Sequence, residues 1–368
     1  MIVKTYLALA ILSLFLFLTP GCDNAPTSGN DGGPIWVTFT RSSSPLLDNK
    51  INDLSSDAEG RMWVATDSGA NAFDDGIWLS FRDSLSWTVS GSSTSATSRV
   101  VSSISETGGK IWFATKGGGL VRFNRSSSTK VWYRFTESNG LGTRTINWVA
   151  GELVHGEVWA GTGVGAFRYV PSLTIPDEGT WVSFTQETSP LPSSNIKVVE
   201  VNINNNSVWF GTYDKGLVYF DGDDQWQTFT IPPQYDARIT SIGFDANSRV
   251  WVGRDASSNF STNSGVSVLH IPTSTWTHYS VIDSNTNGIM PRGPVNAVVT
   301  NLNDSRWFGT NRGLVLQKDT TWRIFNRSNT PELPSDTIRA LAYDSRQNLW
   351  IGTQKGIVVY NPEGTRLK

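Results

Sequence analysis

The chain has 368 residues, of which 38% are hydrophobic and 17% charged, and its formal net charge is −2. A charge this close to zero argues against a nucleic-acid-binding surface, and 34 Gly with few charged residues argue against coiled coils and long surface helices. One Cys excludes an internal disulfide framework and any site with several thiolates, and three His leave little for a zinc site. Sixteen Trp are far too many for a disordered chain.

The first segment is typical of a targeting sequence. Lys4 precedes a twelve-residue, almost wholly apolar run, Leu7 to Leu18. This run is too short to span a bilayer comfortably, but it fits the core of a signal peptide. It is followed by the only Cys of the chain, Cys22. The pattern resembles the lipobox of bacterial lipoproteins, whose Cys is lipidated and becomes the new N-terminus, although Thr19 stands where that family usually has Leu.

We therefore expect residues 1–21 to be a lipoprotein-type signal peptide and Cys22 to be the lipidation site. Residues 22–35, rich in Gly, Pro, Asn and Ser, would form a flexible tether. The protein would then lie in the bacterial cell envelope outside the cytoplasmic membrane, in the periplasm or at the cell surface, held to a membrane only by the lipid. The alternative is an ordinary secreted protein with an incidental Cys near its cleavage site.

The rest of the chain is one unit repeated seven times. Each unit has a Trp followed by small residues, as in WVAT at Trp63 and WIGT at Trp350, at intervals of 49, 47, 50, 42, 56 and 43 residues. A second Trp series, such as WVTF at Trp36, runs in step with the first, and 14 of the 16 Trp fall in the two series. The first series comprises Trp63, Trp112, Trp159, Trp209, Trp251, Trp307 and Trp350, and the second Trp36, Trp78, Trp132, Trp181, Trp226, Trp276 and Trp322.

Two further columns complete the unit. An apolar segment, such as residues 51–54, ends eight to ten residues before each first-series Trp, and a β-type stretch such as GLVYF at Phe220 lies between the two series. Each unit thus holds four short β-type segments separated by Gly, Asn and Asp turns. Four strands at a spacing near 47 residues are the measure of a β-propeller blade.

We therefore predict an all-β fold, a seven-bladed β-propeller with four-stranded blades over residues 36–361, followed by a short tail, residues 362–368. The strand at Trp36 would complete the C-terminal blade, which ends near Tyr360, and ring closure would remove two exposed sheet edges. Large apolar side chains that recur periodically are usually core, so we expect the Trp columns to pack between blades rather than to act as carbohydrate platforms.

The repeat pattern "I…L…D…G..W.GT..GL..Y", cleanest at residues 196–220 and 338–360, resembles the two-component regulator propeller repeat. This resemblance implies ligand sensing, since such propellers commonly form the extracytoplasmic sensor region of hybrid histidine kinases and many are implicated in detecting carbohydrates. Because only PEGTRLK follows the last unit, we expect a stand-alone lipoprotein form, with any two-component signalling passing through a separate histidine kinase.

Binding residues are expected where the repeats disagree. Loops that join the second and third strands of each blade, and those that lead to the next blade, should crowd one face around the central channel. Blade five departs most, because Arg254 replaces the usual Thr and a polar insertion containing Phe260 follows; a second long segment, residues 82–100, contains Trp87. Such an aromatic residue is either a stacking surface for a ligand or part of a mobile surface loop. The candidate ligand-binding residues are Arg254, Asp255, Phe260, Trp87, Tyr213, Asp214, Lys215, Lys116, Arg312 and Lys355.

Catalytic residues are not indicated. Asp53 and Glu200 could approach the channel, but nothing in the sequence makes them an acid–base pair. Trp148, on an innermost strand, would either plug the channel or line a central pocket. We expect a monomeric, non-enzymatic binding or sensor propeller that needs no metal or cofactor and recognises a small molecule, a glycan, a peptide or an envelope protein. The alternative is a polysaccharide-acting hydrolase or lyase on a propeller scaffold, since fold does not decide function.

Overall fold

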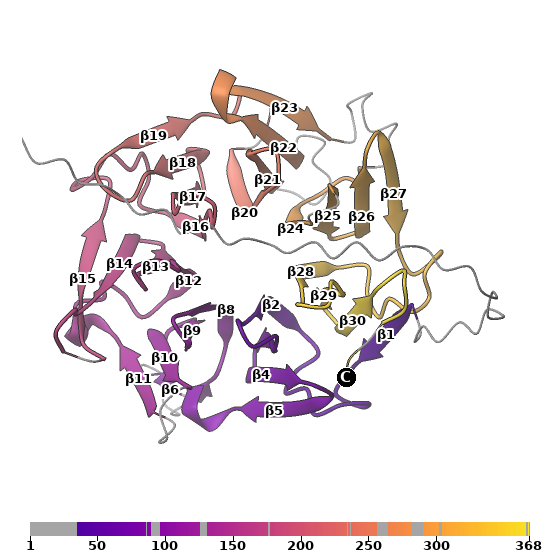
Figure 1. Cartoon of the computed structure of the whole chain (residues 1–368), viewed down its shortest axis with the longest axis horizontal. Coiled ribbons are helices and arrows are strands. Elements are labelled where there is room, and N and C mark those ends of the chain that lie inside the picture. The colour runs from indigo at the N-terminus through magenta and orange to yellow at the C-terminus, as the bar shows by residue number, and fades with distance from the viewer. Residues whose placement is uncertain are drawn as a thin grey trace, which may run out of the picture. The chain divides into compact units, whose positions relative to one another are not determined.

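The structure, a computed structural model, describes residues 35–85, 87–89, 96–125, 131–175, 177–233, 235, 237–255, 264–280, 290–301, 304–365 and 367. Within these residues, seven antiparallel four-stranded sheets form a ring around a central axis (Figure 1). The predicted seven-bladed propeller is therefore confirmed. The expected signal peptide, Cys22, nearly all of the tether and Phe260 lie outside the described residues. No helix in the described part of the chain is long and apolar enough to cross a membrane.

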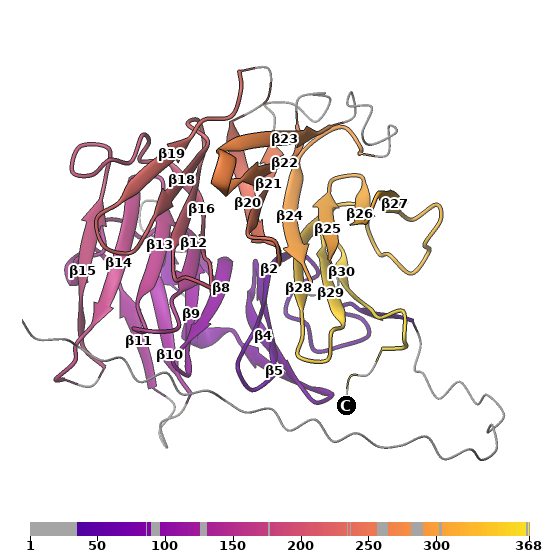
Figure 2. The same cartoon turned by 45° about the horizontal axis from the view of Figure 1, so that its top comes forward.

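The blades follow one another along the chain, and blades one to six each run from the innermost to the outermost strand, whereas blade seven takes its outermost strand from the N-terminal end (Figures 1 and 2). Blade one is β2 (Ile51–Ser56), β3 (Met62–Thr66), β4 (Gly69–Asp74) and β5 (Ile77–Phe81), and blade two is β8 (Val101–Thr107), β9 (Lys110–Thr115), β10 (Leu120–Asn124) and β11 (Val131–Phe135). Blade three is β12 (Ile146–Gly151), β13 (Val158–Thr162), β14 (Gly165–Pro171) and β15 (Gly179–Phe184), and blade four is β16 (Ile196–Val201), β17 (Val208–Thr212), β18 (Leu217–Phe220) and β19 (Trp226–Phe229). Blade five is β20 (Arg238–Phe244), β21 (Arg249–Asp255), β22 (Gly265–His270) and β23 (Thr275–Tyr279), and blade six is β24 (Val295–Thr300), β25 (Ser305–Thr310), β26 (Gly313–Lys318) and β27 (Thr321–Phe325). Blade seven is β28 (Ile338–Tyr343), β29 (Leu349–Thr353), β30 (Gly356–Tyr360) and β1 (Trp36–Phe39).

Short elements lie in the connections between blades and, for η3 (Ile271–Thr273), between the third and fourth strands of blade five. A hairpin of β6 (Trp87–Val89) and β7 (Ala96–Ser98) joins blade one to blade two. The described part of the chain holds three single-turn 3-10 helices, η1 (Asp83–Leu85), η2 (Glu137–Asn139) and η3 (Ile271–Thr273).

The N-terminal strand closes the ring. β1 is the outermost strand of blade seven and pairs antiparallel with β30, with Trp36 opposite Tyr360 and Phe39 opposite Ile357. The Phe39 ring also stacks on Trp350, at 6.1 Å between ring centroids. The predicted closure is therefore confirmed, and it joins the two ends of the propeller in one sheet.

The hydrophobic core lies between neighbouring blades. All seven first-series Trp are buried, with at most 4% of the residue exposed. Trp63 of blade one lies 5.7 Å from Phe113 of blade two, and Trp159 of blade three lies 5.4 Å from Phe210 of blade four, between ring centroids. These side chains fill the spaces between sheets, as predicted, and this packing explains why each unit needs its neighbours.

The small residues after each Trp serve the same packing. A Cβ atom on Gly352 would lie 2.6 Å from Ile51 Cγ2 of the adjacent blade, so only Gly allows the two sheets to approach this closely. The next residue, Thr353, closes the turn: its hydroxyl donates to the Gly356 carbonyl at 2.8 Å and accepts from the Lys355 N–H at 3.0 Å. The Gly-Thr pair is therefore structural.

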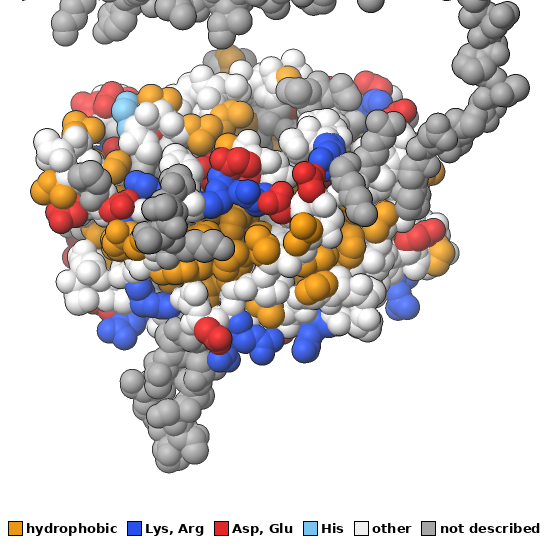
Figure 3. All heavy atoms as spheres, turned by 60° about the horizontal axis from the view of Figure 1, so that its bottom comes forward, with side chains coloured by type: hydrophobic (Ala, Val, Ile, Leu, Met, Phe, Trp, Pro, Cys, Tyr) orange, Lys and Arg blue, Asp and Glu red, His pale blue; other side chains and the backbone are white. Residues whose placement is uncertain are grey.

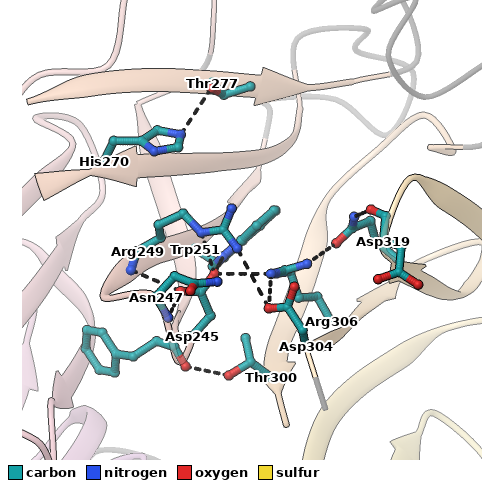
Figure 4. Close-up of polar contacts among 12 residues, drawn as sticks. Asp245, Asn247, Arg249, Trp251, His270, Thr277, Thr300, Asp304, Arg306 and Asp319 are labelled. Atoms are coloured by element: carbon teal, nitrogen blue, oxygen red, sulfur yellow. Dashed lines mark hydrogen bonds and ion pairs between the residues drawn. The ribbon is translucent and has the colours of Figure 1, made fainter. Parts of the chain in front are cut away.

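An Asp turn holds the Trp strand in three blades. In blade five, the Asp245 carboxylate accepts hydrogen bonds from Trp251 Nε1 and Arg249 Nε, both at 2.7 Å (Figure 4). Arg306 of blade six reaches the same carboxylate, with its Nη2 at 3.4 Å. Desolvation opposes ionisation of Asp245, but these hydrogen bonds and the Arg249 charge lower its pKa below the usual value. The turn thus links two neighbouring blades through a buried ionic contact. Equivalent Asp–Trp bonds join Asp57 to Trp63 and Asp344 to Trp350.

Some hydrophobic side chains stay on the outer surface. Ile77 and Leu79, on the outermost strand of blade one, are 64% and 42% exposed. Figure 3 shows hydrophobic side chains as a band across one side of the molecule, with Lys and Arg beside it. This distribution fits a blade whose outermost strand has one face toward solvent.

Candidate ligand-binding pocket

A cavity of about 430 Å³ lies where the innermost strands begin, at one mouth of the central channel. Turns between the second and third strands contribute to the same cavity, so both predicted loop sets share this face. The volume suits a small ligand. We call this cavity the axial pocket; its lining residues are Lys50, Asn52, Asp67, Val100, Ser102, Lys116, Asn147, Trp148, Lys197, Tyr213, Arg238, Thr240, Asp255, Asn296 and Arg339.

A β-bulge in every innermost strand places one residue of each blade in the axial pocket. In blade one, for example, the pairing register shifts between Ile51 and Asp53, which leaves Asn52 outside the ladder. A bulge redirects a side chain that regular pleating would place elsewhere. The seven bulge residues, which we call the bulge ring, are all polar and all line the pocket. They are Asn52, Ser102, Asn147, Lys197, Thr240, Asn296 and Arg339.

Six members of the bulge ring tie their own blade to the next one. Asn52 Nδ2 donates to the Val101 carbonyl at 2.8 Å, and Arg339 Nε donates to the Ile51 carbonyl at 2.8 Å, which links blade seven to blade one. The four other hydrogen bonds of this kind are Ser102 to Ile146, Asn147 to Ile196, Thr240 to Val295 and Asn296 to Ile338. These bonds hold the wall of the pocket in one arrangement.

Lys197 is the exception in the bulge ring. Among the described residues it makes no such bond to the next blade; its ammonium lies 5.0 Å from the centroid of the Tyr213 ring instead. Arg238, at the start of β20, approaches the same ring with its guanidinium carbon at 4.0 Å. The Tyr213 N–H donates to the Asn195 carbonyl at 2.9 Å, and this bond fixes the turn that carries the ring. Two cations thus share one aromatic side chain in the pocket.

The lining carries five cationic side chains and two carboxylates, an excess of three positive charges. Lys50 Nζ lies 2.7 Å from Asp67 Oδ2, and Asn52 Nδ2 donates to Asp67 Oδ1 at 2.8 Å. Desolvation opposes ionisation of Asp67, but these hydrogen bonds and the Lys50 charge lower its pKa. Asp255 pairs with Arg238 at 3.7 Å. Both carboxylates are therefore engaged, while positive charge remains in excess.

Lys116 projects from the turn between β9 and β10. Its backbone N–H donates to the Val100 carbonyl at 3.1 Å, and its Nζ donates to Asn147 Oδ1 at 2.7 Å. The side chain remains accessible to solvent at the rim, but desolvation by the surrounding atoms, together with the Lys197 charge, lowers its pKa to about 8. Lys116 of blade two and Lys197 of blade four thus place two positive charges in the same pocket.

Trp148 lies between the axial pocket and a second cavity of about 270 Å³, because it lines both. Asp53 and Glu200 line that second cavity. Burial raises the pKa of Asp53 to about 7, although the carboxylate accepts hydrogen bonds from the Ile104 and Leu54 N–H groups, each at 2.9 Å. Burial and the Asp53 charge raise the pKa of Glu200 to about 8. Trp148 therefore lines a central pocket and also separates two cavities.

The structure places the sequence-predicted candidates in three groups. Lys116, Tyr213 and Asp255 line the axial pocket. A second group is exposed on turns of the same kind but outside the lining: Asp214, Lys215, Arg312 and Lys355. Of Trp87 only the backbone, in β6, is described, and Phe260 lies outside the described residues.

Arg254 forms the third group by itself. Its side chain is fully buried, and its guanidinium carbon lies 4.9 Å from the centroid of the Tyr235 ring. Tyr235 in turn stacks on His278 at 3.9 Å. The replacement of Thr in blade five therefore builds an internal aromatic–cation stack, and the Arg254 side chain does not face solvent.

Sequence reasoning missed most of the pocket lining, namely Lys50, Asn52, Ser102, Asn147, Lys197, Arg238, Thr240, Asn296 and Arg339. A signal was available: the second residue of each innermost segment is polar in all seven units, between an Ile or Val and the rest of the segment. Among the described residues, no group of three or more His, Cys, Asp or Glu could hold a metal ion.

Comparison with known proteins agrees with this repeat pattern. Residues 45–68 and 332–355 match the family model of the two component regulator propeller. The chain carries two component regulator propeller repeats. The matched segments lead into and include the innermost strands of blades one and seven and the Trp strands that follow them, so they include the bulge residues Asn52 and Arg339.

Relatives of this propeller include larger proteins. A histidine kinase of Formosa agariphila is 22% identical over 170 residues, which cover 44% of this chain and 12% of the kinase. The extracellular domain of BT3049 from B. thetaiotaomicron, a protein assigned to the hybrid two component systems, has a TM-score of 0.68 at 18% identity, over 89% of this chain and 42% of that one. A streptogramin B lyase structure has a TM-score of 0.63 at 12% identity, over 89% of this chain and 97% of that one. At these identities the structural matches show a shared fold.

Proposed function

We propose that this protein is a non-enzymatic, extracytoplasmic binding propeller that takes a saccharide or peptide ligand into the axial pocket and serves a sensing role. The observation that carries this proposal is the bulge ring: one polar residue from every blade lines a single cavity. Six of these side chains are held by hydrogen bonds between blades, so the polar groups are arranged before the ligand arrives. Preorganisation of this kind lowers the entropic cost of binding.

The sensing role rests on the relatives. The chain spans 12% of the F. agariphila histidine kinase and 42% of the BT3049 extracellular domain, so their whole-protein activities are carried over only as a proposal. A separate histidine kinase is the proposed signalling partner, with an envelope protein as the alternative partner.

The location rests on the N-terminal segment and on the extracellular domain that shares the fold. We propose a lipid anchor at Cys22. Replacing Cys22 with Ser should move the protein from the membrane fraction to the soluble fraction of the cell envelope. Unchanged fractionation of Cys22→Ser would contradict the anchor and favour simple secretion.

Binding is tested with the purified full-length protein on an array of plant and microbial glycans. Binding to the glycans that the array detects should weaken in Lys116→Ala, which alters the pocket. It should persist in Lys355→Ala, because Lys355 is exposed and lies outside the pocket lining. Equal loss in both variants, or none in either, would place the binding surface elsewhere.

A polysaccharide hydrolase or lyase is the second candidate. It is favoured by two carboxyl groups with raised pKa, Asp53 and Glu200, in one cavity of the channel. Each glycan hit should therefore be incubated with the protein and analysed for new reducing ends or unsaturated products. Intact glycan supports the binding module, and cleavage would replace it with the enzyme.

A further inference from the structure

The five cationic side chains of the axial pocket differ in the contacts that they make with the pocket wall. Lys50 is engaged by Asp67 at 2.7 Å, and Arg339 donates to the Ile51 carbonyl at 2.8 Å and to Asn52 Oδ1 at 3.1 Å. These two cations therefore stabilise the wall of the axial pocket. The three other cations come from blades two, four and five: Lys116, Lys197 and Arg238. Of these three, Arg238 has a carboxylate nearby, Asp255 at 3.7 Å.

Lys116 and Lys197 face the cavity without a carboxylate partner among the described residues. Lys116 contacts the neutral amide of Asn147, and Lys197 contacts the neutral ring of Tyr213. Two ammonium groups near each other in a partly desolvated site repel, and in free protein that repulsion is relieved by losing a proton or by gaining an anion. Desolvation is the main cause of the lowered pKa of Lys116, and the Lys197 charge adds to it.

Lys197 also differs from the other members of the bulge ring. Each of the six other bulge residues donates a hydrogen bond to a carbonyl of the next blade, whereas the Lys197 ammonium lies over the Tyr213 ring, which Arg238 also contacts. A bulge residue that lacks the hydrogen bond to the next blade either has a different function or is not needed for the link between blades. Because Lys197 lines the cavity and shares the Tyr213 ring with a second cation, we favour a different function, namely ligand binding.

We propose that the axial pocket binds an anionic group of its ligand, a carboxylate, sulfate or phosphate, between Lys116, Lys197 and Arg238. This inference rests on the proposed binding function and narrows the ligand to an acidic one. Ammonium and guanidinium groups bind such oxygens through charge-assisted hydrogen bonds, which are about twice as strong as neutral ones. The same wall carries the neutral amides of Asn52, Asn147 and Asn296, which hydrogen bonds to the next blade hold in place.

The experiment compares charged and neutral probes of similar size on the full-length protein. Glucuronate and glucose, at matched ionic strength, distinguish a carboxylate from its neutral analogue, and sodium sulfate and sodium phosphate test the two other anions. Affinity is measured by calorimetry and by the shift in thermal unfolding. We expect at least one anion to bind at least about tenfold more tightly than glucose, and its identity assigns the anionic group.

Variants locate the site. Lys197→Gln and Lys116→Gln should each weaken anion binding about tenfold, the loss expected for one charge-assisted contact, while Lys355→Gln should leave it unchanged. Unfolding without ligand checks that the variants remain folded. Binding should also draw in protons at pH 8, because a bound anion raises the pKa of Lys116 from about 8; calorimetry in buffers of different ionisation enthalpy measures this uptake.

Two results would overturn the inference. One is equal binding of glucose and all three anions, or no anion binding at all; the other is anion binding that survives in both pocket variants. Neutral glycans that bind in the array and lose affinity in Lys116→Ala would keep the proposed binding function while removing the acidic ligand. A protein that binds no glycan and no anion would contradict both the proposed binding function and the acidic ligand.

Discussion

The guanidinium carbon of Arg238 lies 4.0 Å from the centroid of the Tyr213 ring, although the two residues belong to different blades. Arg238 begins the innermost strand of blade five, and Tyr213 lies in the turn between the second and third strands of blade four. Lys197 contacts the same ring at 5.0 Å. Tyr213 therefore sets the positions of two cations in the axial pocket.

Replacing Tyr213 with Ala should release both cations and weaken binding of the best anionic probe by about fivefold to thirtyfold, since each of the two exposed cation–π contacts contributes about 0.5–1 kcal/mol. Tyr213→Phe keeps the ring face and should bind nearly as the wild type does. Calorimetric titration of the three proteins measures the difference. A loss in Tyr213→Phe equal to that in Tyr213→Ala would assign the effect to the hydroxyl group instead.

Arg254 should matter for stability. Because its buried side chain fills space and stacks on Tyr235, Arg254→Ala should lower the free energy of unfolding by about 2–4 kcal/mol. Arg312→Ala, at an exposed turn of the next blade, should change it by less than about 0.5 kcal/mol. Denaturant unfolding followed by Trp fluorescence measures both. If Arg254→Ala kept its stability but lost ligand binding, Arg254 would be a ligand-binding residue rather than a structural one.

Stability should depend on pH through the channel carboxyl groups. The pKa values of Asp53 and Glu200, about 7 and about 8 in the folded protein, lie above the ordinary values of 3.8 and 4.5, so the folded state retains protons that the unfolded state releases. Their contribution to stability is therefore complete below about pH 4 and is lost as pH rises through 7 and 8.

Glu200→Gln removes one of these titrations and should raise the free energy of unfolding by about 1–3 kcal/mol at pH 9, with little change at pH 4. Glu187→Gln is the matched control, since Glu187 is exposed in a loop outside the channel. The measurement is denaturant unfolding at several pH values. Parallel pH profiles for wild type and Glu200→Gln would contradict the assignment.

The Asp245 turn should be a structural link between blades five and six. Asp245→Ala removes the acceptor for Trp251, Arg249 and Arg306, and should lower the free energy of unfolding by about 2–4 kcal/mol, because buried donors lose their partner (Figure 4). Asp221 makes a comparable turn, accepting from three backbone N–H groups at 2.9–3.1 Å, but it is not buried. Asp221→Ala should therefore cost less than about 1 kcal/mol, and equal losses would show that the turn, rather than the burial, matters.

The architecture was predictable because its causes are local and repeated. Each unit carries its own strand pattern and its own Trp, and a single four-stranded sheet cannot bury both faces, so the number of units determined the number of blades. The position of Trp36 before the first full unit likewise determined the closure with the Tyr360 strand, confirmed by their pairing. The two Trp columns were correctly assigned to packing for the same reason.

The axial pocket was predictable only in part. Turn residues such as Lys116 and Tyr213 stand out because they vary between units at a fixed place in the repeat. Arg254 stands out in the same way, yet its side chain folds inward onto Tyr235, and a sequence comparison of turns cannot distinguish the two directions.

Tertiary structure alone decided which polar residues meet. Simple alternation along a strand does not account for the bulge that leaves Asn52 and Arg339 outside their ladders and in the pocket. These two side chains are 287 positions apart, and a hydrogen bond of 3.1 Å joins them only because the ring closes. The sequence by itself determined seven blades and their order; the radial convergence of the innermost strands determined the composition and charge of the pocket.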